Sequence, residues 1–374
     1  MHASHILYRL PNERIVHELR SSSKPKELPA IEDINAKRGY VFAHFTISSQ
    51  RPLLLIEPEV ETSWILPKRF AARHFDYTDT EAQNHAQYAT EFAQSKQLLE
   101  EKQVEKIVLS RRLTLQLDSK VDSDDLHNLF LAACNNYPAC YVALVQTPQA
   151  GTWLMATPEV LLEERDGCLH TMALAATMSL DEGGNLPAEE WSEQQRQEQQ
   201  MVADYIEQRL VALQLPHTKS ALHIKRSAQL AHLCTRFTIP IPETYAIGQV
   251  LSALHPTPAV CGIPTTFAHQ NILHIESHDR SYYTGFSGPI GLASGTHTYV
   301  TLRCMQIDGQ HAHLYAGGGL LPQSDEKREW IETCRKLKAI IALFQSRLQS
   351  KSLLPSPLEL ITLCLTHMRV YCLQ

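Results

Sequence analysis

The spacing of apolar and polar residues predicts a chain rich in β-strands. Between Lys106 and Leu117, one face of the predicted strand is apolar at every position except Arg111. Lys106 lies on the other face. This alternation is typical of a strand buried on one side. Asp166-Gly167 and Asp308-Gly309 each separate two strand-like runs, and Asp-Gly favours a tight turn. We expect hairpins at both places.

Two longer runs are each expected to form one continuous strand. They are residues 153–164 and residues 299–307, and the second run is expected to pair with residues 311–317. Arg303 stands in the second run among otherwise apolar side chains.

Three helices are expected, at about residues 80–103, 187–213 and 324–345. Hairpins outnumber strand–helix–strand crossovers, so the pattern indicates an α+β layered sandwich and not a doubly wound sheet. The chain divides into a divergent N-terminal part of the same fold, a core, and a C-terminal extension without an assigned role, at residues 1–80, 81–347 and 348–374.

Composition and charge restrict the class of protein. The 374 residues are 44% apolar and 20% charged, with a net charge of −6, and this balance argues against a nucleic-acid partner. The nine cysteines show no CxxC spacing, which indicates reduced thiols. No signal peptide is recognised, and the apolar run at 353–374 is too polar to span a bilayer. We therefore expect a cytoplasmic protein.

Three glutamates on two expected helices are candidate metal ligands. Glu198 projects from the apolar side of its helix, where an unpaired carboxylate would be costly. It either turns out to water or binds a cation. Glu329, Glu332 and Lys336 are three and four residues apart, so they share one helical stripe. Oxygen-only ligands suit Mg²⁺.

Arg303 and two glycines are candidates for binding an anionic ligand. Arg303 is either an exposed arginine on a sheet face or a bidentate clamp for a carboxylate. Gly317 and Gly319 stand at the end of the predicted strand 311–317. There they either allow close approach of a ligand or simply form a turn.

Lys106, Glu159 and His232 are candidates for proton transfer or binding. Lys106 begins a central strand, where burial would lower its pKa and make it a base; the alternative is a strand-end lysine in water. Glu159 opens another strand, and a buried carboxyl with a raised pKa could protonate a leaving group. His232 lies among apolar neighbours, and a hydrogen-bonded core histidine is the alternative.

Over residues 80–346 the chain resembles the chorismate-utilising enzymes of menaquinone, siderophore, tryptophan and folate synthesis. The resemblance rests on short motifs in a fixed order: Lys106-Ile-Val-Leu-Ser-Arg, Thr157-Pro-Glu159, Leu174-Ala-Ala-Thr177, Arg196-Gln-Glu198, His232-Leu233, His255-Pro-Thr-Pro-Ala259, Asp279-Arg280, Thr301-Leu-Arg-Cys304, Ala316-Gly-Gly-Gly319 and Glu329-Trp-Ile-Glu-Thr333 with Lys336. It implies two mostly antiparallel sheets at the core with helices outside.

Within that superfamily the chain looks most like the isochorismate synthases. Those enzymes carry a lysine at the position of Lys106, whereas the aminodeoxychorismate branch carries one in the segment that here reads 173–177, and this chain has none there. The resemblance implies that Lys106 deprotonates water for attack at ring C2 and that Glu159 protonates the departing C4 hydroxyl. It also implies that Glu198 and Glu332 ligate Mg²⁺, with Glu329 close by.

The same resemblance implies how the substrate, a dianion, is held. Arg303 and the backbone near Gly317 and Gly319 would bind the enolpyruvyl carboxylate. Further contacts would come from Lys336 and His232, with Thr177 capping the pocket floor. The family has glycine where this chain has Ala176. If that position needs a positive φ or close approach, the extra methyl group would crowd the site.

These motifs imply an isomerase of the hydroxymutase type that needs no glutamine amidotransferase subunit, nucleic acid or membrane and acts as a monomer. Menaquinone synthesis is the expected pathway, with a catechol siderophore pathway as the alternative. Salicylate synthase is the nearest rival activity, anthranilate synthase is a weaker one, and a non-catalytic chorismate-binding protein is the rival from another class.

Overall fold

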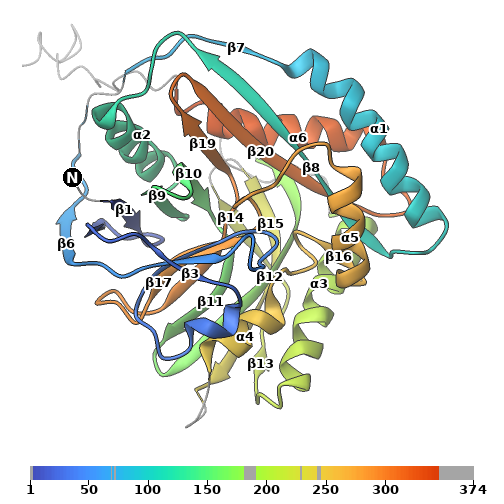
Figure 1. Ribbon diagram of the computed structural model, residues 1–374. Helices are drawn as coiled ribbons and strands as arrows, with labels where there is room; N and C mark the ends of the chain where they lie inside the picture. The colour runs from blue at the N-terminus through green and yellow to red at the C-terminus, as the bar shows by residue number, and fades with distance from the viewer. Residues whose placement is uncertain are drawn as a thin grey trace, which may run out of the picture.

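The computed structural model describes residues 3–68, 70, 73–180, 191–227, 230–241 and 246–344. Within these residues the chain forms two antiparallel sheets of ten strands each and six α-helices (Figure 1). The sheets lie face to face and the helices cover their outer faces. The α+β layered sandwich predicted from the pattern is confirmed.

The first sheet, here called sheet A, contains the long strand predicted at Lys106–Leu117. Its order is β16 (Gly262–Ile263), β8 (Lys106–Leu117), β20 (His311–Leu320), β19 (Cys304–Asp308), β10 (Gly151–Thr157), β9 (Tyr141–Thr147), β1 (Ser4–Arg9), β2 (Ile15–Ser21) and β6 (Val60–Ile65), with β7 (Tyr77–Asp79) also on β8.

The second sheet, sheet B, contains the hairpin closed by Asp166-Gly167. Its order is β13 (Thr218–Lys219), β15 (Leu230–Pro240), β12 (Cys168–Ser179), β11 (Val160–Arg165), β18 (His297–Val300), β17 (Phe286–Ile290), β4 (Gly39–Ala43), β5 (Leu53–Ile56) and β3 (Lys26–Leu28), with β14 (His223–Ser227) on β15. Strands from residues 1–80 thus belong to both sheets.

The helices are divided between the two outer faces. Sheet A is covered by α1 (Glu81–Glu100), α2 (Ser123–Asn136), α5 (Thr265–Ile275) and α6 (Glu326–Ile341). Sheet B is covered by α3 (Glu193–Ala212), α4 (Ile247–Leu254) and the 3₁₀ turn Ile31–Ile34.

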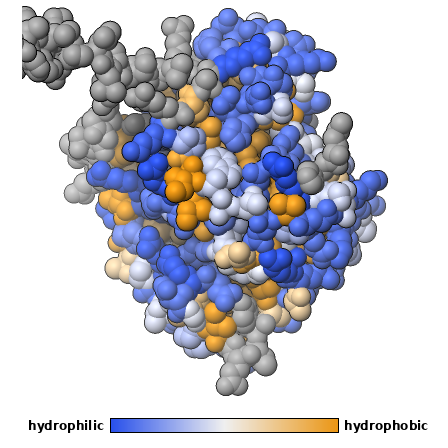
Figure 2. Space-filling model, turned by 90° about the vertical axis from the view of Figure 1, so that its left-hand side faces the viewer, coloured by the Kyte–Doolittle hydropathy of each residue, from blue (hydrophilic) through white to orange (hydrophobic). Residues whose placement is uncertain are grey.

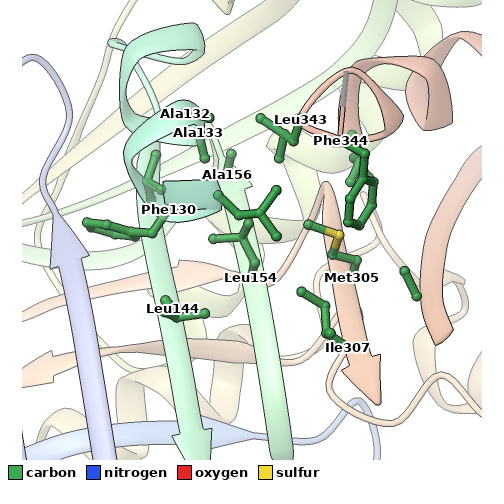
Figure 3. Close-up of a cluster of buried hydrophobic side chains, with 14 of the residues drawn as sticks. Phe130, Ala132, Ala133, Leu144, Leu154, Ala156, Met305, Ile307, Leu343 and Phe344 are labelled. Atoms are coloured by element: carbon green, nitrogen blue, oxygen red, sulfur yellow. The ribbon is translucent and has the colours of Figure 1, made fainter. Parts of the chain in front are cut away.

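The outer face of sheet A packs into an aliphatic core. Figure 3 shows Phe130 of α2 beside Leu144 and Leu154 of neighbouring strands, with Met305 and Phe344 further along. Each such side chain contributes about 1.5–3 kcal/mol on full burial. This packing ties the end of α6 to sheet A.

Aromatic rings fill the space between the sheets. Tyr141 of sheet A and Tyr299 of sheet B stack at a centroid distance of 4.2 Å, and Trp153 is fully buried nearby. Large rings in offset or stacked contact make a rigid layer. The two sheets therefore form one unit.

The two runs predicted as continuous strands each bend from one sheet to the other. Residues 153–164 break at Pro158-Glu159, between β10 and β11, and residues 299–307 break at residues 301–303, between β18 and β19. The prediction of single strands was wrong, because Pro158 has no N–H for a sheet ladder and Arg303 has a φ of 46°.

These two breaks, here called the first and second crossovers, lie side by side. Val300 N donates to Glu159 O at 3.0 Å, and Ala156 N donates to Arg303 O at 3.2 Å. Glu159 and Arg303 therefore project from adjacent points where the chain passes between the sheets. Arg303 is not within a strand, as had been predicted, but directly before β19.

The predicted helix ends needed adjustment. α3 begins at Glu193 and not near Pro187, because the Ser192 side chain caps it by accepting from Gln195 N. The last helix begins after Asp325, which caps it in the same way. The predicted extension 348–374 lies outside the described residues.

In the described part of the chain, every helix is too short or too polar to cross a bilayer. Figure 2 shows a mostly hydrophilic face with small, separate apolar patches. The seven cysteines among the described residues are all free, as the scattered spacing indicated.

Candidate active site

A cavity of about 100 Å³ lies where the two crossovers meet the helices. Its walls come from β8 and β20 of sheet A, β12 and β15 of sheet B, and α3 and α6. Nine of the eleven residues predicted for the site line it: Glu159, Thr177, Glu198, His232, Arg303, Gly317, Gly319, Glu332 and Lys336. The other two, Lys106 and Glu329, lie directly behind this lining.

Glycines in β20 let other groups approach its backbone. A Cβ at Gly319 would collide with Glu198 Oε1 and lie 2.7 Å from Lys106 Cε. A Cβ at Gly317 would lie 2.9 Å from the Leu109 carbonyl oxygen. Real Cβ atoms are not found that close, so both glycines are required for packing of the site.

Lys106 is fully buried and pairs with Glu198. Lys106 Nζ lies 2.9 Å from Glu198 Oε1, although the contact lacks hydrogen-bond geometry and the amine makes no such bond to the described residues. The alternative of a strand-end lysine in water is excluded by its 0% exposure. Glu198 likewise does not turn out to water but takes a cation as its partner.

Glu159 is buried at the first crossover. Burial raises the pKa of its carboxyl to about 8, against the opposing effects of Lys106 and Lys225. The burial of this carboxyl and the upward direction of its pKa agree with the expectation for this position, and its role in catalysis stays a prediction. At neutral pH the group is therefore largely protonated and can give up a proton.

Arg303 and His232 form one hydrogen-bonded chain with the backbone of β12. Arg303 Nη2 donates to His232 Nε2 at 2.8 Å, so the imidazole proton belongs on Nδ1, which donates to Ala176 O at 3.0 Å. Burial, and then the charges of Arg303 and Lys336, hold the pKa of His232 well below its usual range. His232 is thus a neutral acceptor for the guanidinium.

Ala176 has the left-handed backbone that the sequence raised as a concern. Its φ is 57°, and the β12–β15 register shifts between Ala175 and Met178, which marks a bulge. The bulge turns the Ala176 carbonyl toward His232. Thr177 follows with its hydroxyl 3.4 Å from His232 Nδ1 and lines the cavity.

Helix α6 brings two carboxylates and one amine to the glycine strand. Lys336 Nζ donates to Gly317 O at 2.7 Å and pairs with Glu332 Oε1 at 2.8 Å. Glu329 accepts from Ser324 Oγ at 2.8 Å. Burial and then the Glu332 carboxylate raise the pKa of Glu329 to about 8, and Glu198 acts in the same direction.

The three predicted metal ligands lie near one another along β20 but do not form a closed set. A Cβ at Gly318 would lie 3.1 Å from Glu329 Oε2 and 4.0 Å from Glu332 Oε1, and Gly319 abuts Glu198. Among the described residues no group of three or more His, Cys, Asp or Glu side chains is placed to hold a metal. The donors nevertheless have the right chemistry, since carboxylate oxygens are what Mg²⁺ binds.

Several supporting residues were not found from the sequence. Gln199, beside Glu198, is buried and bonds to Ala175 N at 2.9 Å and Ala173 O at 3.1 Å, which fixes α3 against β12. Arg280 donates to Val108 O and Glu276 accepts from Ser110 N, so a buried ion pair completes the open edge of β8. The Asp279-Arg280 motif could have signalled the second case.

The chain belongs to the chorismate binding enzyme family, whose sequence model matches residues 35–345. Isochorismate synthase EntC of Escherichia coli (strain K12) is 30% identical over 256 residues, which are 65% of this chain and 63% of EntC. The chain thus aligns with somewhat less than two thirds of that relative's length.

Solved structures show the same fold. MenF, the menaquinone-specific isochorismate synthase from Escherichia coli, superposes with a TM-score of 0.76 at 21% identity, covering 91% of this chain and 89% of MenF. Anthranilate synthase component I from Streptococcus pneumoniae TIGR4 superposes with a TM-score of 0.64 at 15% identity, covering 90% and 89%. Since relatives named for different reactions share the fold, the reaction must be argued from the site.

Proposed function

We propose that this protein is an isochorismate synthase, which converts chorismate to isochorismate with Mg²⁺ bound. The observation that carries the proposal is a fully buried lysine and a buried, largely protonated carboxyl at one cavity, with Glu159 in its lining and Lys106 directly behind that lining. Lys106 comes from sheet A and Glu159 from the first crossover, and the Lys106 charge lowers the pKa of Glu159 against the larger effect of burial. Family membership and the similarity to EntC support it.

In the proposed reaction Lys106 acts in its neutral form: its amine takes a proton from water, whose oxygen bonds to ring C2. The ring double bonds shift, the C4–O bond breaks, and Glu159 gives its proton to the departing hydroxyl, which leaves as water. One water enters and one leaves, so substrate and product are isomers. General acid and base groups each typically supply about 10²–10⁴-fold.

The substrate's two carboxylates need positive charge. Arg303 lines the cavity with one guanidinium nitrogen bonded to His232, and Lys336 adds a second charge at the same wall. Bidentate pairing with arginine fixes orientation as well as charge. Gly317 and Gly319 keep the backbone of β20 open to the ligand.

Glu198 and Glu332 are the residues we infer to hold Mg²⁺, with Glu329 close by. The carboxylates of Glu198, Glu329 and Glu332 lie beside residues 318–319 of β20, and Lys106 and Lys336 pair with Glu198 and Glu332. When bound, the ion would neutralise the ring carboxylate and orient it.

We also predict that the protein is a cytoplasmic monomer that needs no amidotransferase subunit and acts in menaquinone synthesis. The identity of the neighbouring genes would test the pathway.

The direct experiment is incubation of the purified protein with chorismate and Mg²⁺, with products separated by liquid chromatography. We expect isochorismate, and loss of turnover in excess chelator that returns when Mg²⁺ is restored. No isochorismate, alone or with a coupled isochorismate-consuming enzyme, would refute the proposal. Salicylate and pyruvate as the main products would move the assignment to salicylate synthase. Formation of anthranilate that depends on ammonia would move it to anthranilate synthase.

A further inference from the structure

Lys225 of β14 supports the first crossover from the side of sheet B. It stands opposite His232 in the β14–β15 ladder and is partly buried. Its Nζ donates to Pro158 O at 2.7 Å and lies 3.5 Å from Met172 Sδ. The amine thus reaches beneath β15 and β12 to the residue directly before Glu159.

The crossover needs such a partner because it has left both ladders. Pro158 offers no N–H, and Glu159 N donates to the nearby Thr157 hydroxyl at 3.3 Å. Glu159 O accepts from Val300 N at 3.0 Å. With the bond from Lys225, the peptide groups on both sides of the Glu159 Cα are held, and the direction of its side chain is set.

We propose that Lys225 is a positioning residue for Glu159: it anchors the Pro158 carbonyl and places a second positive charge, besides that of Lys106, near the carboxyl. This inference rests on the proposed role of Glu159 as the proton donor. Lys225 itself does not line the cavity and is not placed to touch a substrate.

The electrostatics agree with the geometry. Lys106 and Lys225 both lower the pKa of Glu159, in that order, against the larger effect of burial, which brings it to about 8. Burial lowers the pKa of Lys225. Since a nearby positive charge favours the carboxylate, Lys225 limits how far burial can raise the pKa of Glu159.

Other titratable groups face the pair and must be kept constant in a test. Cys234 and Arg236 of β15, Glu163 of β11 and Cys140 act on Lys225. Glu159 faces in addition Lys106 of β8 and the Thr257 hydroxyl, and it acts on Tyr283. A substitution at Lys225 leaves all of these residues in place, but it also removes a charge that lowers the pKa of Cys234 and that of His232, which stands opposite Lys225.

The experiment is the pH profile of kcat for chorismate turnover in wild type, Lys225→Met and Lys225→Arg. Activity should fall as pH rises through the pKa of the proton donor. In Lys225→Met we expect this basic limb to move upward by roughly one pH unit, the low end of what one nearby charge does to a carboxyl. Lys225→Arg, which keeps the charge and a donor, should restore the wild-type limb.

Lys219→Met is the matched control, because it also removes a lysine of sheet B. Lys219 lies away from the cavity, and its Nζ is 2.8 Å from Glu207 Oε2. Its limb should stay in place. A folded Lys225→Met protein whose activity falls equally at every pH, with the limb unmoved, overturns the proposal. A wild-type protein without isochorismate formation would instead fail the proposed function itself.

Lys225→Gln keeps the test decisive if Lys225→Met does not fold, since it removes the charge but retains a polar tip. The same upward shift is expected, with thermal unfolding recorded alongside. If both neutral variants fail to fold while Lys225→Arg folds, Lys225 builds the crossover and does not merely position Glu159, and the proposal is overturned.

Discussion

Lys106 Nζ lies 2.9 Å from Glu198 Oε1, so the amine proposed to activate water is paired with a carboxylate proposed to hold Mg²⁺. Lys106 is fully buried, whereas the Glu198 side chain is 17% exposed toward the cavity. A buried ion pair is costly to break from either end. The base and the metal site are therefore coupled through one carboxylate.

Lys106→Met should abolish turnover while leaving substrate binding measurable. We expect kcat to fall by about 10²–10⁴-fold, the usual contribution of a general base. Mg²⁺-dependent binding of chorismate, followed by titration calorimetry, should persist because Arg303 and Lys336 are unchanged. The exposed Lys120 is the matched position. Lys120→Met should behave as wild type, and near-normal rates in Lys106→Met would remove Lys106 from the mechanism.

His232→Ala should weaken substrate binding more than it slows the reaction. Arg303 would lose the acceptor at 2.8 Å that orients its guanidinium. A hydrogen bond to a charged group supports an affinity loss of roughly ten- to a hundredfold, with kcat changed less. Steady-state kinetics of the variant and of wild type test this by comparing the change in KM with the change in kcat.

His232→Gln provides the conservative comparison, since a glutamine oxygen can still accept from Arg303, and it should recover part of the affinity. His311→Ala is the control, because His311 is exposed at the far end of β20. Equal losses in the alanine and glutamine variants would show that the acceptor is not what matters.

The sequence predicted which residues gather at the cavity better than it predicted the path of the backbone. Lys106 stands out because it is a lysine in a strand whose other positions are mostly apolar, and β8 has the predicted bounds. The crossovers were missed because the interior of the sandwich is apolar on both sheets. Alternation therefore continues through the bend at Glu159 and through the bend at Arg303, and only Pro158 signals a break.

Contacts that depend on strand order could not be predicted. Lys225 and Gln199 reach groups that are 67 and 24–26 residues distant in the chain, and their partners are backbone atoms, which leave no mark on the sequence. The resemblance to the family located Arg303 correctly at the cavity, but its hydrogen bond to His232 emerges only when β15 lies beside the second crossover.

Folding stability should show the cost of burying Glu159. Its folded pKa is raised from 4.5 to about 8, so the folded state keeps a proton that the unfolded chain releases. Stability from this group is complete below about pH 4.5 and is lost as pH rises through about 8. Glu159→Gln removes this pH dependence. Between pH 5 and 8 the free energy of unfolding of the variant should therefore rise relative to that of wild type, by a few kcal/mol at most.

Urea unfolding at pH 5 and at pH 8 measures this difference. Glu164→Gln is the control, since Glu164 is exposed in β11, the strand that directly follows Glu159. A stability difference between wild type and Glu159→Gln that does not change with pH would contradict the raised pKa, whatever the effect on turnover.

Ala176→Gly should stabilise the protein, although glycine substitutions in strands usually do the reverse. Ala176 has a φ of 57° in the β12 bulge, a conformation that costs an alanine about 1 kcal/mol more than a glycine. Ala176 is only 7% exposed, so removal of its methyl group loses some buried apolar area, which offsets part of this gain. We expect a gain of roughly 0.5–1 kcal/mol in the free energy of unfolding, reduced by the greater freedom of glycine in the unfolded chain.

The neighbouring Ala175→Gly isolates the backbone effect, because Ala175 is equally buried and has no positive φ. That variant should lose about 1 kcal/mol, since glycine weakens an ordinary strand position. Urea unfolding of both variants without ligand gives the comparison. If Ala176→Gly loses as much as Ala175→Gly, the left-handed backbone at residue 176 is not strained, and the alanine there is an ordinary replacement for the family's glycine.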